Sequence, residues 1–199
     1  MQDQLLVLAS GSPRRKELLA GLGLSFEVIV SDVDESFAPG ADPVELVQEL
    51  AYRKAKAVAN SLSHGLVLGA DTIVVSDGAI LGKPVDEEDA KRMLSKLSGH
   101  AHMVYTGIAF VEAGGGQEVR DVCGTKVVMK ELSPELIARY VASGHPMDKA
   151  GAYGIQGAAS AFIPEIQGDY FNVVGLPVSL VADHLAGFGF EILANQEGR

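Results

Sequence analysis

Two adjacent arginines, Arg14 and Arg15, follow a short turn and predict an anion-binding site near the start of the chain. Ser12 is suited to cap a helix that begins at Pro13, so both arginines fall in the first helical turn. Cations at this position face the positive end of the helix dipole, which disfavours each by about 0.3–1 kcal/mol unless an anion lies nearby. Unpaired N–H groups at a helix start and arginine side chains together bind phosphate. The alternative is an ordinary helix with two solvated arginines.

Lys54 falls in the middle of the apolar side of a second predicted helix. Its neighbours on that side, by helical spacing, are Val47, Leu50, Ala51, Ala55 and Val58. These residues leave two interpretations evenly matched. In one, the ammonium lies in a cleft between this helix and a sheet; in the other, the side chain extends past a thin edge of the core to solvent.

Asp71 interrupts the most hydrophobic strand predicted in the chain, residues 66–75. A lone buried carboxylate is costly, so it requires a cation, a metal ion or several hydrogen-bond donors beside it. Buried carboxylates of this kind are candidates for catalysis. The alternative is a carboxylate that caps a strand kink or pairs with a structural lysine.

Lys83 and Glu35 are two further charged residues that could serve the same site. The segment 78–84 superficially resembles a P-loop, but only three residues separate its glycines, and Pro84 stands where a magnesium-binding Ser or Thr is needed. Lys83 therefore either points its charge at the same cleft or lies on the surface. Glu35 follows the second predicted strand together with two aspartates, and such carboxylates either bind a hard divalent cation or are solvated.

Gln156 lies in a glycine-rich segment, residues 148–157, in which glycines recur every third residue. Such a segment lets the backbone approach a flat ligand, and the Gln156 amide can both donate to and accept from the edge of a base. A tight loop of several turns is the alternative.

The sequence lacks the motifs of several other enzyme classes. No serine has glycines two residues to either side, and the five histidines include no His-Glu-x-x-His. His100 and His102, near a strand start, are interpreted as ordinary polar residues. Cys123 is the single cysteine, so the sequence holds no disulfide framework or cysteine zinc site, and a buried structural thiol is expected.

The composition indicates a packed, acidic protein. The chain has 199 residues, 47% of them hydrophobic, and 16 Lys and Arg against 26 Asp and Glu give a net charge of −10. A chain of this length buries roughly 70% of its unfolded surface, which predicts one domain over residues 1–199. The negative charge disfavours nucleic acid as a partner. The lone cysteine, a start without a basic leader and the lack of a long apolar stretch predict a cytoplasmic protein that does not bind a membrane.

Helices are predicted to alternate with strands. The expected strands are residues 5–9, 26–30, 66–75, 79–81, 103–111, 118–129, 161–163 and 170–174. The expected helices are 13–22, 43–60, 87–97, 133–144 and one that starts at 177. Because hairpins at 77–78 and 114–116 interrupt the alternation, the fold class is α/β with a mixed sheet.

Residues 8–19, LASGSPRRKELL, closely resemble the opening of the Maf family of nucleoside triphosphate pyrophosphatases. The match continues through the motifs at residues 69–72, 82–84, 97–99, 105–107, 148–157 and 174–177. The resemblance implies an inosine-triphosphatase-like α/β fold, with an elongated mixed sheet flanked by helices, in two lobes around a central cleft. It also implies a cytoplasmic enzyme that hydrolyses nucleoside triphosphates between the α and β phosphates with Mg²⁺ or Mn²⁺. A link to removal of non-standard nucleotides and to cell-division arrest is implied as well.

The resemblance assigns roles to individual residues. Asp71 matches the proton acceptor of the family, and Glu35 matches an acidic residue near the metal ion. The residues that match the phosphate site are Ser10, Arg14, Arg15, Lys54 and Lys83. The expected mechanism has a metal ion held partly by Asp71 and Glu35, water activated by Asp71 directly or through the metal, and cations that neutralise the leaving pyrophosphate.

Three positions associated with base preference in the family are occupied here by Arg14, Thr72 and Gln156. This combination resembles the subgroup that acts on dTTP and UTP, and Gln156 is expected to read the pyrimidine edge. The alternatives are the same chemistry on another base such as 7-methyl-GTP, a non-catalytic regulator that senses nucleotides, and a nucleic-acid-binding module. A homodimer is an open alternative for the oligomeric state.

Overall fold

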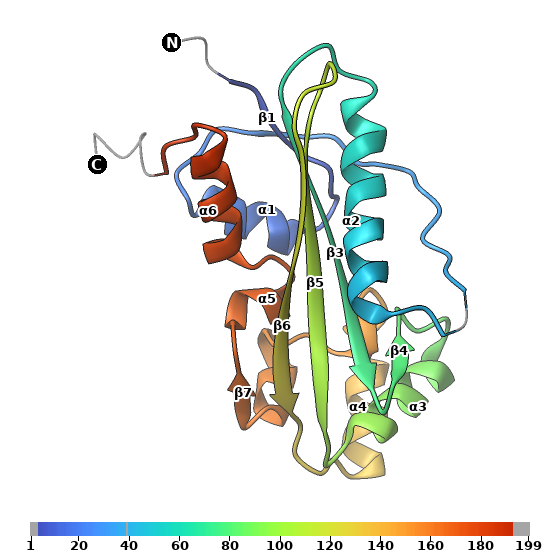
Figure 1. The fold of residues 1–199 in the computed structure, drawn as a ribbon. Coiled ribbons are helices and arrows are strands. Elements are labelled where there is room, and N and C mark those ends of the chain that lie inside the picture. Colours follow the sequence, from blue (N-terminus) through green and yellow to red (C-terminus); the bar gives the residue numbers. More distant parts are fainter. Residues whose placement is uncertain (1–3, 39, 193–199) are drawn as a thin grey trace. The chain divides into compact units, whose positions relative to one another are not determined.

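The computed structural model describes residues 4–38 and 40–192, and its helices and strands alternate along the chain (Figure 1). The strands are β1 (Leu6–Leu8), β2 (Glu27–Val28), β3 (Leu66–Ser76), β4 (Ala79–Leu81), β5 (Ala101–Glu112), β6 (Glu118–Val128) and β7 (Glu165–Gln167). The α-helices are α1 (Pro13–Ala20), α2 (Pro43–Ala59), α3 (Glu87–Leu97), α4 (Pro134–Ala142), α5 (Tyr170–Val174) and α6 (Val178–Gly187), and the 3₁₀ helices are η1 (Ala150–Ala152) and η2 (Gly157–Phe162). Residues 1–3 and Pro39, which enter the leader and loop predictions, lie outside the described residues.

The sheet is mixed, as predicted. Its strand order is β2-β1-β3-β5-β6-β7, and β4 pairs with β3 outside this path. β1 runs parallel to β2 and β3, whereas β4 is antiparallel to β3 and β7 is antiparallel to β6. The α/β class is therefore confirmed.

The chain forms two compact units. Of the described residues, unit 1 comprises 4–38, 40–71, 106–123 and 175–192, and unit 2 comprises 72–105 and 124–174. β3 passes from unit 1 to unit 2 between Asp71 and Thr72. Each predicted site residue consequently belongs to a defined unit.

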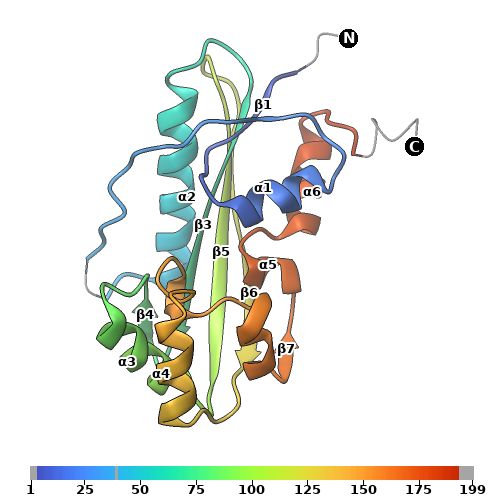
Figure 2. The same cartoon turned by 180° about the vertical axis from the view of Figure 1, so that it is seen from behind.

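In unit 1, helices cover both faces of the strands, because alternate strand residues point to opposite faces. One face packs against α1 and α6, and its core includes Leu6, Leu8, Leu19, Leu66, Leu68, Ile108, Phe110 and Leu185. The other face packs against α2, and its core includes Val7, Ala9, Ala51, Ala55, Val58, Val67, Ala109 and Val111. Figures 1 and 2 show α2 on one side of these strands and α1 and α6 on the other.

Unit 2 has its own core. α3 and α4 pack against each other, as seen from behind in Figure 2. The buried residues of this core include Val74, Leu81, Leu94, Leu97, Val104, Val127, Met129, Tyr153 and Phe162. The glycine-rich loop thus contributes side chains to the core of unit 2 through Tyr153.

Most predicted elements are confirmed, and the exceptions lie in the last third of the chain. Residues 161–163 are not a strand, because the small residues before them form η2, in which the Ser160 hydroxyl donates to the Gly157 carbonyl at 2.7 Å. Residues 170–174 form α5 instead of a strand, because the Asp169 carboxylate accepts the Phe171 N–H at 2.7 Å and starts a helical turn. Cys123 is partly exposed, not buried.

Candidate active site

The turn after β1 has the predicted capped geometry. Ser12 is extended, with φ −71° and ψ 117°, and its hydroxyl accepts the Arg15 N–H at 3.5 Å. Pro13 is the first residue of α1, and the first turn of this helix contains no acidic residue. Arg14 and Arg15 therefore occupy the positive end of α1, where only an anion or a local acceptor relieves them.

The Arg15 guanidinium holds this turn to a distant part of unit 1. Its Nε donates to the Gly175 carbonyl at 2.8 Å, and one terminal nitrogen donates to the Ser10 hydroxyl at 3.2 Å. The Ser10 hydroxyl, which is 8% exposed, also accepts the Ser12 N–H at 3.3 Å. The phosphate-site residues Ser10 and Arg15 thus contact each other directly.

The charges around Arg15 place it in the same neighbourhood as the carboxylates of the site. Burial lowers the pKa of Arg15, the negative charges of Asp71 and Glu35 oppose this decrease, and the adjacent Arg14 adds to it. The two arginines and the two carboxylates therefore act on one another electrostatically within unit 1.

Helix α2 carries Lys54, and two glycines allow this helix to approach the sheet closely. Asp42 caps α2 by accepting the Val44 and Glu45 N–H groups at 2.9 and 3.0 Å. A Cβ atom at Gly69 of β3 would collide with the α2 backbone, and a Cβ atom at Gly107 of β5 would do the same one turn away. No larger residue fits at either position while α2 keeps its place.

Asp71 and Lys54 meet because of this close approach. Gly69 and Asp71 point to the same face of β3, since they are two residues apart, and that face is covered by α2. The Lys54 ammonium lies 2.5 Å from Asp71 Oδ1 and 2.7 Å from Glu35 Oε1. Both Lys54 and Asp71 are only 8% exposed, whereas half of the Glu35 side chain is exposed. One buried cation therefore compensates two carboxylates.

The remaining predicted residues belong to unit 2. Thr72 directly follows Asp71 on β3, Lys83 is exposed after β4, and Gln156 is exposed immediately before η2. The loops that carry Lys83 and Gln156 are connected, because the Gly151 N–H donates to the Gly82 carbonyl at 3.0 Å. The structure thus gathers six predicted residues in unit 1 and joins the loops of two others in unit 2.

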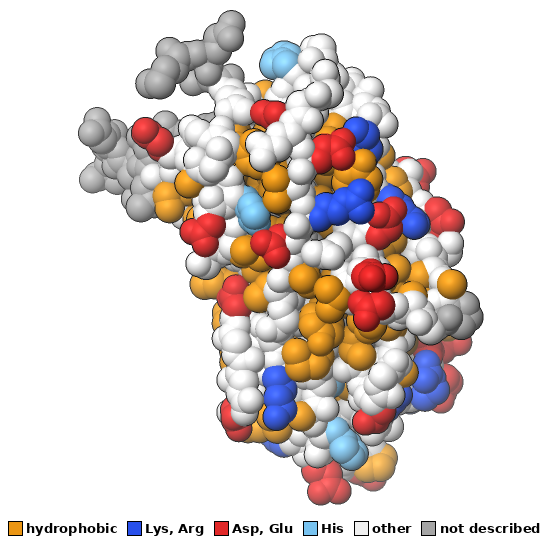
Figure 3. All heavy atoms as spheres, viewed as in Figure 1, with side chains coloured by type: hydrophobic (Ala, Val, Ile, Leu, Met, Phe, Trp, Pro, Cys, Tyr) orange, Lys and Arg blue, Asp and Glu red, His pale blue; other side chains and the backbone are white. Residues whose placement is uncertain are grey.

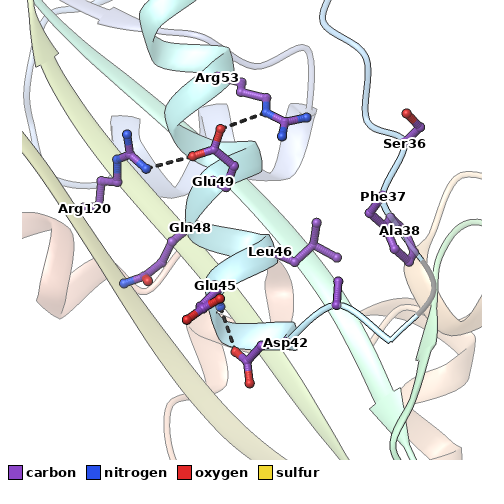
Figure 4. Close-up of a pocket in the computed structure, with 11 residues that line it drawn as sticks. Ser36, Phe37, Ala38, Asp42, Glu45, Leu46, Gln48, Glu49, Arg53 and Arg120 are labelled. Atoms are coloured by element: carbon purple, nitrogen blue, oxygen red, sulfur yellow. Dashed lines mark hydrogen bonds and ion pairs between the residues drawn. The ribbon is translucent and has the colours of Figure 1, made fainter.

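A separate groove of about 570 Å³ lies beside α2 in unit 1 (Figure 4). It is lined by Ser36, Phe37, Ala38, Ala41, Asp42, Glu45, Leu46, Gln48, Glu49, Arg53 and Arg120. Glu49 accepts from Arg53 and Arg120 at 2.9 and 2.8 Å, and Figure 3 shows basic and acidic side chains next to one another on the surface of unit 1. No predicted site residue lines the groove, although Glu35 belongs to the loop that forms one of its walls.

Two features of the structure were not predicted from the sequence. The Gly175 carbonyl, at a residue with φ +129°, accepts from Arg15, and a glycine before Leu-Pro was the available signal. His102, interpreted from sequence as an ordinary polar residue, is only 3% exposed. Its alternation with the buried residues Val104 and Thr106 along β5 was the available signal.

Two absences hold for residues 4–38 and 40–192. No group of three or more His, Cys, Asp or Glu residues in these ranges is arranged to hold a metal ion. No helix within them combines the length and apolarity needed to cross a lipid bilayer.

Comparison with known proteins identifies relatives across nearly the whole chain. Residues 5–188 match the family model described as Maf-like protein. A dTTP/UTP pyrophosphatase of Desulforamulus reducens is 54% identical over 188 residues, which cover 94% of this chain and 98% of the relative. Proteins of the same name from Moorella thermoacetica and Symbiobacterium thermophilum are 52% and 51% identical and cover 94% and 98% of this chain, and 96% and 100% of their own lengths.

A solved structure, the Staphylococcus aureus Ham1 protein, shares the fold. It superposes with a TM-score of 0.51 at 16% identity and covers 93% of this chain and 100% of its own. The similarity supports the predicted inosine-triphosphatase-like α/β fold. The match to the family model and the identity to these relatives show that the chain belongs to the Maf family.

Proposed function

We propose that this chain hydrolyses dTTP and UTP to the monophosphate and pyrophosphate. The relatives of known name support this substrate class, since they are dTTP/UTP pyrophosphatases at 50% identity or more over most of the chain. The observation that carries the proposal is the buried contact of Lys54 with Asp71 at 2.5 Å, beside a helix start that lacks acidic residues. This arrangement offers a carboxylate base next to cations suited to phosphate.

Asp71 is the proposed general base. Its carboxylate accepts a proton from a water molecule, whose oxygen bonds to phosphorus at the α–β linkage as the bond to the bridging oxygen breaks. Lys54 holds the carboxylate in place through their contact and adds positive charge where the pyrophosphate leaves. Because both side chains are buried, water and salt screen this charge little.

Ser10, Arg14 and Arg15 are the proposed phosphate ligands of unit 1. The N–H groups at the start of α1 point out of the end of the helix at which the two arginines lie. Arg15 is already held by Ser10 and Gly175, so it is preorganised and loses little freedom when an anion binds. Arg14 lies beside it on the same turn and adds a second guanidinium.

Asp71 and Glu35 suit a divalent cation. Their carboxylates converge on one cation, the Lys54 ammonium, and hard ions such as Mg²⁺ bind to one or two carboxylates plus substrate phosphates. We propose that these two residues hold Mg²⁺ or Mn²⁺ when nucleotide is bound. When bound, the ion supplies charge neutralisation of the phosphate oxygens.

Base preference is assigned to Arg14, Thr72 and Gln156, and Lys83 is proposed as a further phosphate ligand. Support for the unit 2 residues comes from the hydrogen bond that joins the loops of Lys83 and Gln156. The Gln156 amide can donate to and accept from a pyrimidine edge, as the two-sided pattern of that edge requires.

Pyrophosphate release from dTTP, UTP, CTP, 7-methyl-GTP and ITP, each with Mg²⁺, with Mn²⁺ and with a chelator, tests the proposal. The expected result is metal-dependent release that is fastest with dTTP and UTP. Fast hydrolysis of 7-methyl-GTP alone would assign the same chemistry to another base. Binding of nucleotide without release under either metal would indicate a sensor instead of an enzyme. We also propose a role in cell-division arrest, and a variant without turnover tests whether that role requires hydrolysis.

A further inference from the structure

A buried hydrogen bond anchors the glycine-rich loop to the sheet of unit 2. His102 Nε2 on β5 lies 2.6 Å from the Tyr153 hydroxyl, and the two rings meet edge to face with centroids 5.4 Å apart. His102 is 3% exposed and Tyr153 is 5% exposed. Tyr153 lies three residues before Gln156, so this contact fixes the loop close to the proposed base-reading amide.

The backbone just before Tyr153 adopts a conformation that needs support from its surroundings. Gly151 and Ala152 have φ +69° and +60°, and Ala152 is a residue with a side chain in this left-handed region. Such a conformation costs roughly 1–2 kcal/mol for a residue other than glycine. A Cβ atom at Gly151 would lie 2.9 Å from the Val74 side chain, so the loop also packs tightly on β3.

Two further features carry the effect of the anchor along the loop. The Gly151 N–H donates to the Gly82 carbonyl at 3.0 Å, directly before Lys83. On the other side of Tyr153, Ile155 is buried at 7% exposure, directly before Gln156. The loop is therefore fixed on both sides of Tyr153, and the turn that bears Lys83 is tied to it.

The His102 ring is retained in the core at a cost. Among the residues that the structure describes, its Nδ1 has no hydrogen-bond partner, and an unsatisfied buried polar atom costs about 1–3 kcal/mol. Burial lowers the pKa of His102 to about 4 and raises that of Tyr153, so both rings are neutral near pH 7. An apolar side chain would avoid the unsatisfied nitrogen but could not bond to the Tyr153 hydroxyl.

We propose that His102 and Tyr153 are positioning residues that hold the glycine-rich loop in the conformation required for Gln156 and Lys83 to engage the nucleotide. This inference rests on the function proposed above. It assigns a role in substrate recognition to two side chains that do not themselves touch the substrate.

The direct test is Tyr153→Phe, which removes only the hydroxyl. Loss of a buried hydrogen bond is expected to raise KM for dTTP and UTP and to reduce preference over CTP and 7-methyl-GTP by about tenfold each, while kcat changes by less than about threefold. His102→Phe should have the same effect. The double variant should change KM and base preference no more than either single variant does, because all three variants remove the same hydrogen bond. Hydrogen exchange should accelerate at the Gly151 amide in each variant.

Two control variants separate positioning from general stability. Tyr170→Phe makes the same chemical change at an exposed tyrosine of unit 2 and should alter neither KM nor base preference. Leu97→Ala opens a cavity in the core of the same unit and should lower Tm without changing base preference. A shift of base preference in Leu97→Ala equal to that in Tyr153→Phe would overturn the proposal.

Gln156→Ala distinguishes failure of this inference from failure of the proposed function. A change of base preference in Gln156→Ala but none in Tyr153→Phe would refute the anchor alone. Unchanged base preference in Gln156→Ala, or no pyrophosphate release by the unmodified protein, would refute the proposed recognition or activity. In those cases unaltered exchange of the Gly151 amide in Tyr153→Phe would refute the anchor as well.

Discussion

The two units hold their proposed functional residues by different means. In unit 1, charged side chains are buried together, and one ammonium compensates the carboxylates of Asp71 and Glu35. In unit 2, neutral groups hold the loop: His102 and Tyr153 share a hydrogen bond, and Gly151 adopts a left-handed backbone conformation. The charged arrangement suits chemistry on phosphate, while the neutral one suits recognition that tolerates changes of salt.

This difference predicts how strongly substitutions should affect each unit. Removal of one member of a buried charge set leaves the others uncompensated, so small chemical changes in unit 1 should have large effects. The unit 2 loop loses a single hydrogen bond or a single backbone conformation at a time, so its changes should be smaller and graded.

The largest expected effect is the loss of turnover in Asp71→Asn. An amide cannot accept the proton of water, so kcat should fall by at least about 1,000-fold while nucleotide binding persists. Pyrophosphate release and calorimetric titration with dTTP measure the two properties. Glu118→Gln, the same change at an exposed carboxylate of unit 1, is the control and should keep full activity. Substantial residual turnover in Asp71→Asn would contradict the assignment of the general base to Asp71 of unit 1.

Lys54→Met should give the next largest effect, a loss of about 3–5 kcal/mol in the free energy of unfolding, because Asp71 is left buried without its cation. Urea unfolding measures it. Lys56→Met on the same helix breaks an exposed pair with Glu118 and should leave the free energy of unfolding nearly unchanged. Similar losses in both variants would mean that the buried charges of unit 1 are no more sensitive than surface ones.

Acid should weaken unit 2 through His102. Burial lowers the pKa of His102 from 6.5 to about 4, so the unfolded chain binds this proton at a higher pH than the folded chain. The contribution of neutral His102 to the free energy of unfolding is present above pH 6.5 and is lost as the pH falls. The loss is about 2 kcal/mol at pH 5 and about 3 kcal/mol at pH 4. Urea unfolding of the unmodified protein and of His102→Gln at pH 7 and pH 5 isolates this loss. Equal pH dependence in both would contradict the assignment.

Gly151→Ala should give the smallest of these effects, a destabilisation of about 2 kcal/mol, from a left-handed φ of +69° and a contact with Val74. Gly144→Ala has a similar φ of +75° and open space around the new Cβ atom, so it should cost only about 1 kcal/mol. Thermal unfolding compares them. Equal destabilisation by Gly151→Ala and Gly144→Ala would show that the loop is not packed tightly on β3.

The charged residues of unit 1 could be predicted because they violate local patterns. Lys54 stands on an apolar helix face and Asp71 in an apolar strand, and burial of each alone would be costly, so their contact explains both. The cap at Ser12 was predictable because its side chain satisfies a helix N–H group locally.

The neutral features of unit 2 gave weaker signals. A buried histidine on a strand resembles any polar residue in sequence, and its burial depends on partners such as Tyr153 that are distant along the chain. Segments 161–163 and 170–174 were wrongly predicted as strands because short runs of apolar residues fit a strand or a helical turn equally well. In unit 1, the Gly175 carbonyl binds Arg15 through the backbone, so the glycine before Leu-Pro was its only signal in the sequence.

The close approach of α2 to the sheet also bears on how this centre could be rebuilt in a different scaffold. Copying Ser10, Arg14, Arg15, Glu35, Lys54 and Asp71 onto another α/β protein would reproduce the charges. It would not reproduce the spacing, because Gly69 and Gly107 are what let the helix backbone rest against the strands. A designer who omitted these two uncharged residues would obtain a lysine held too far from its aspartate, so the smallest residues belong among the first to be transferred.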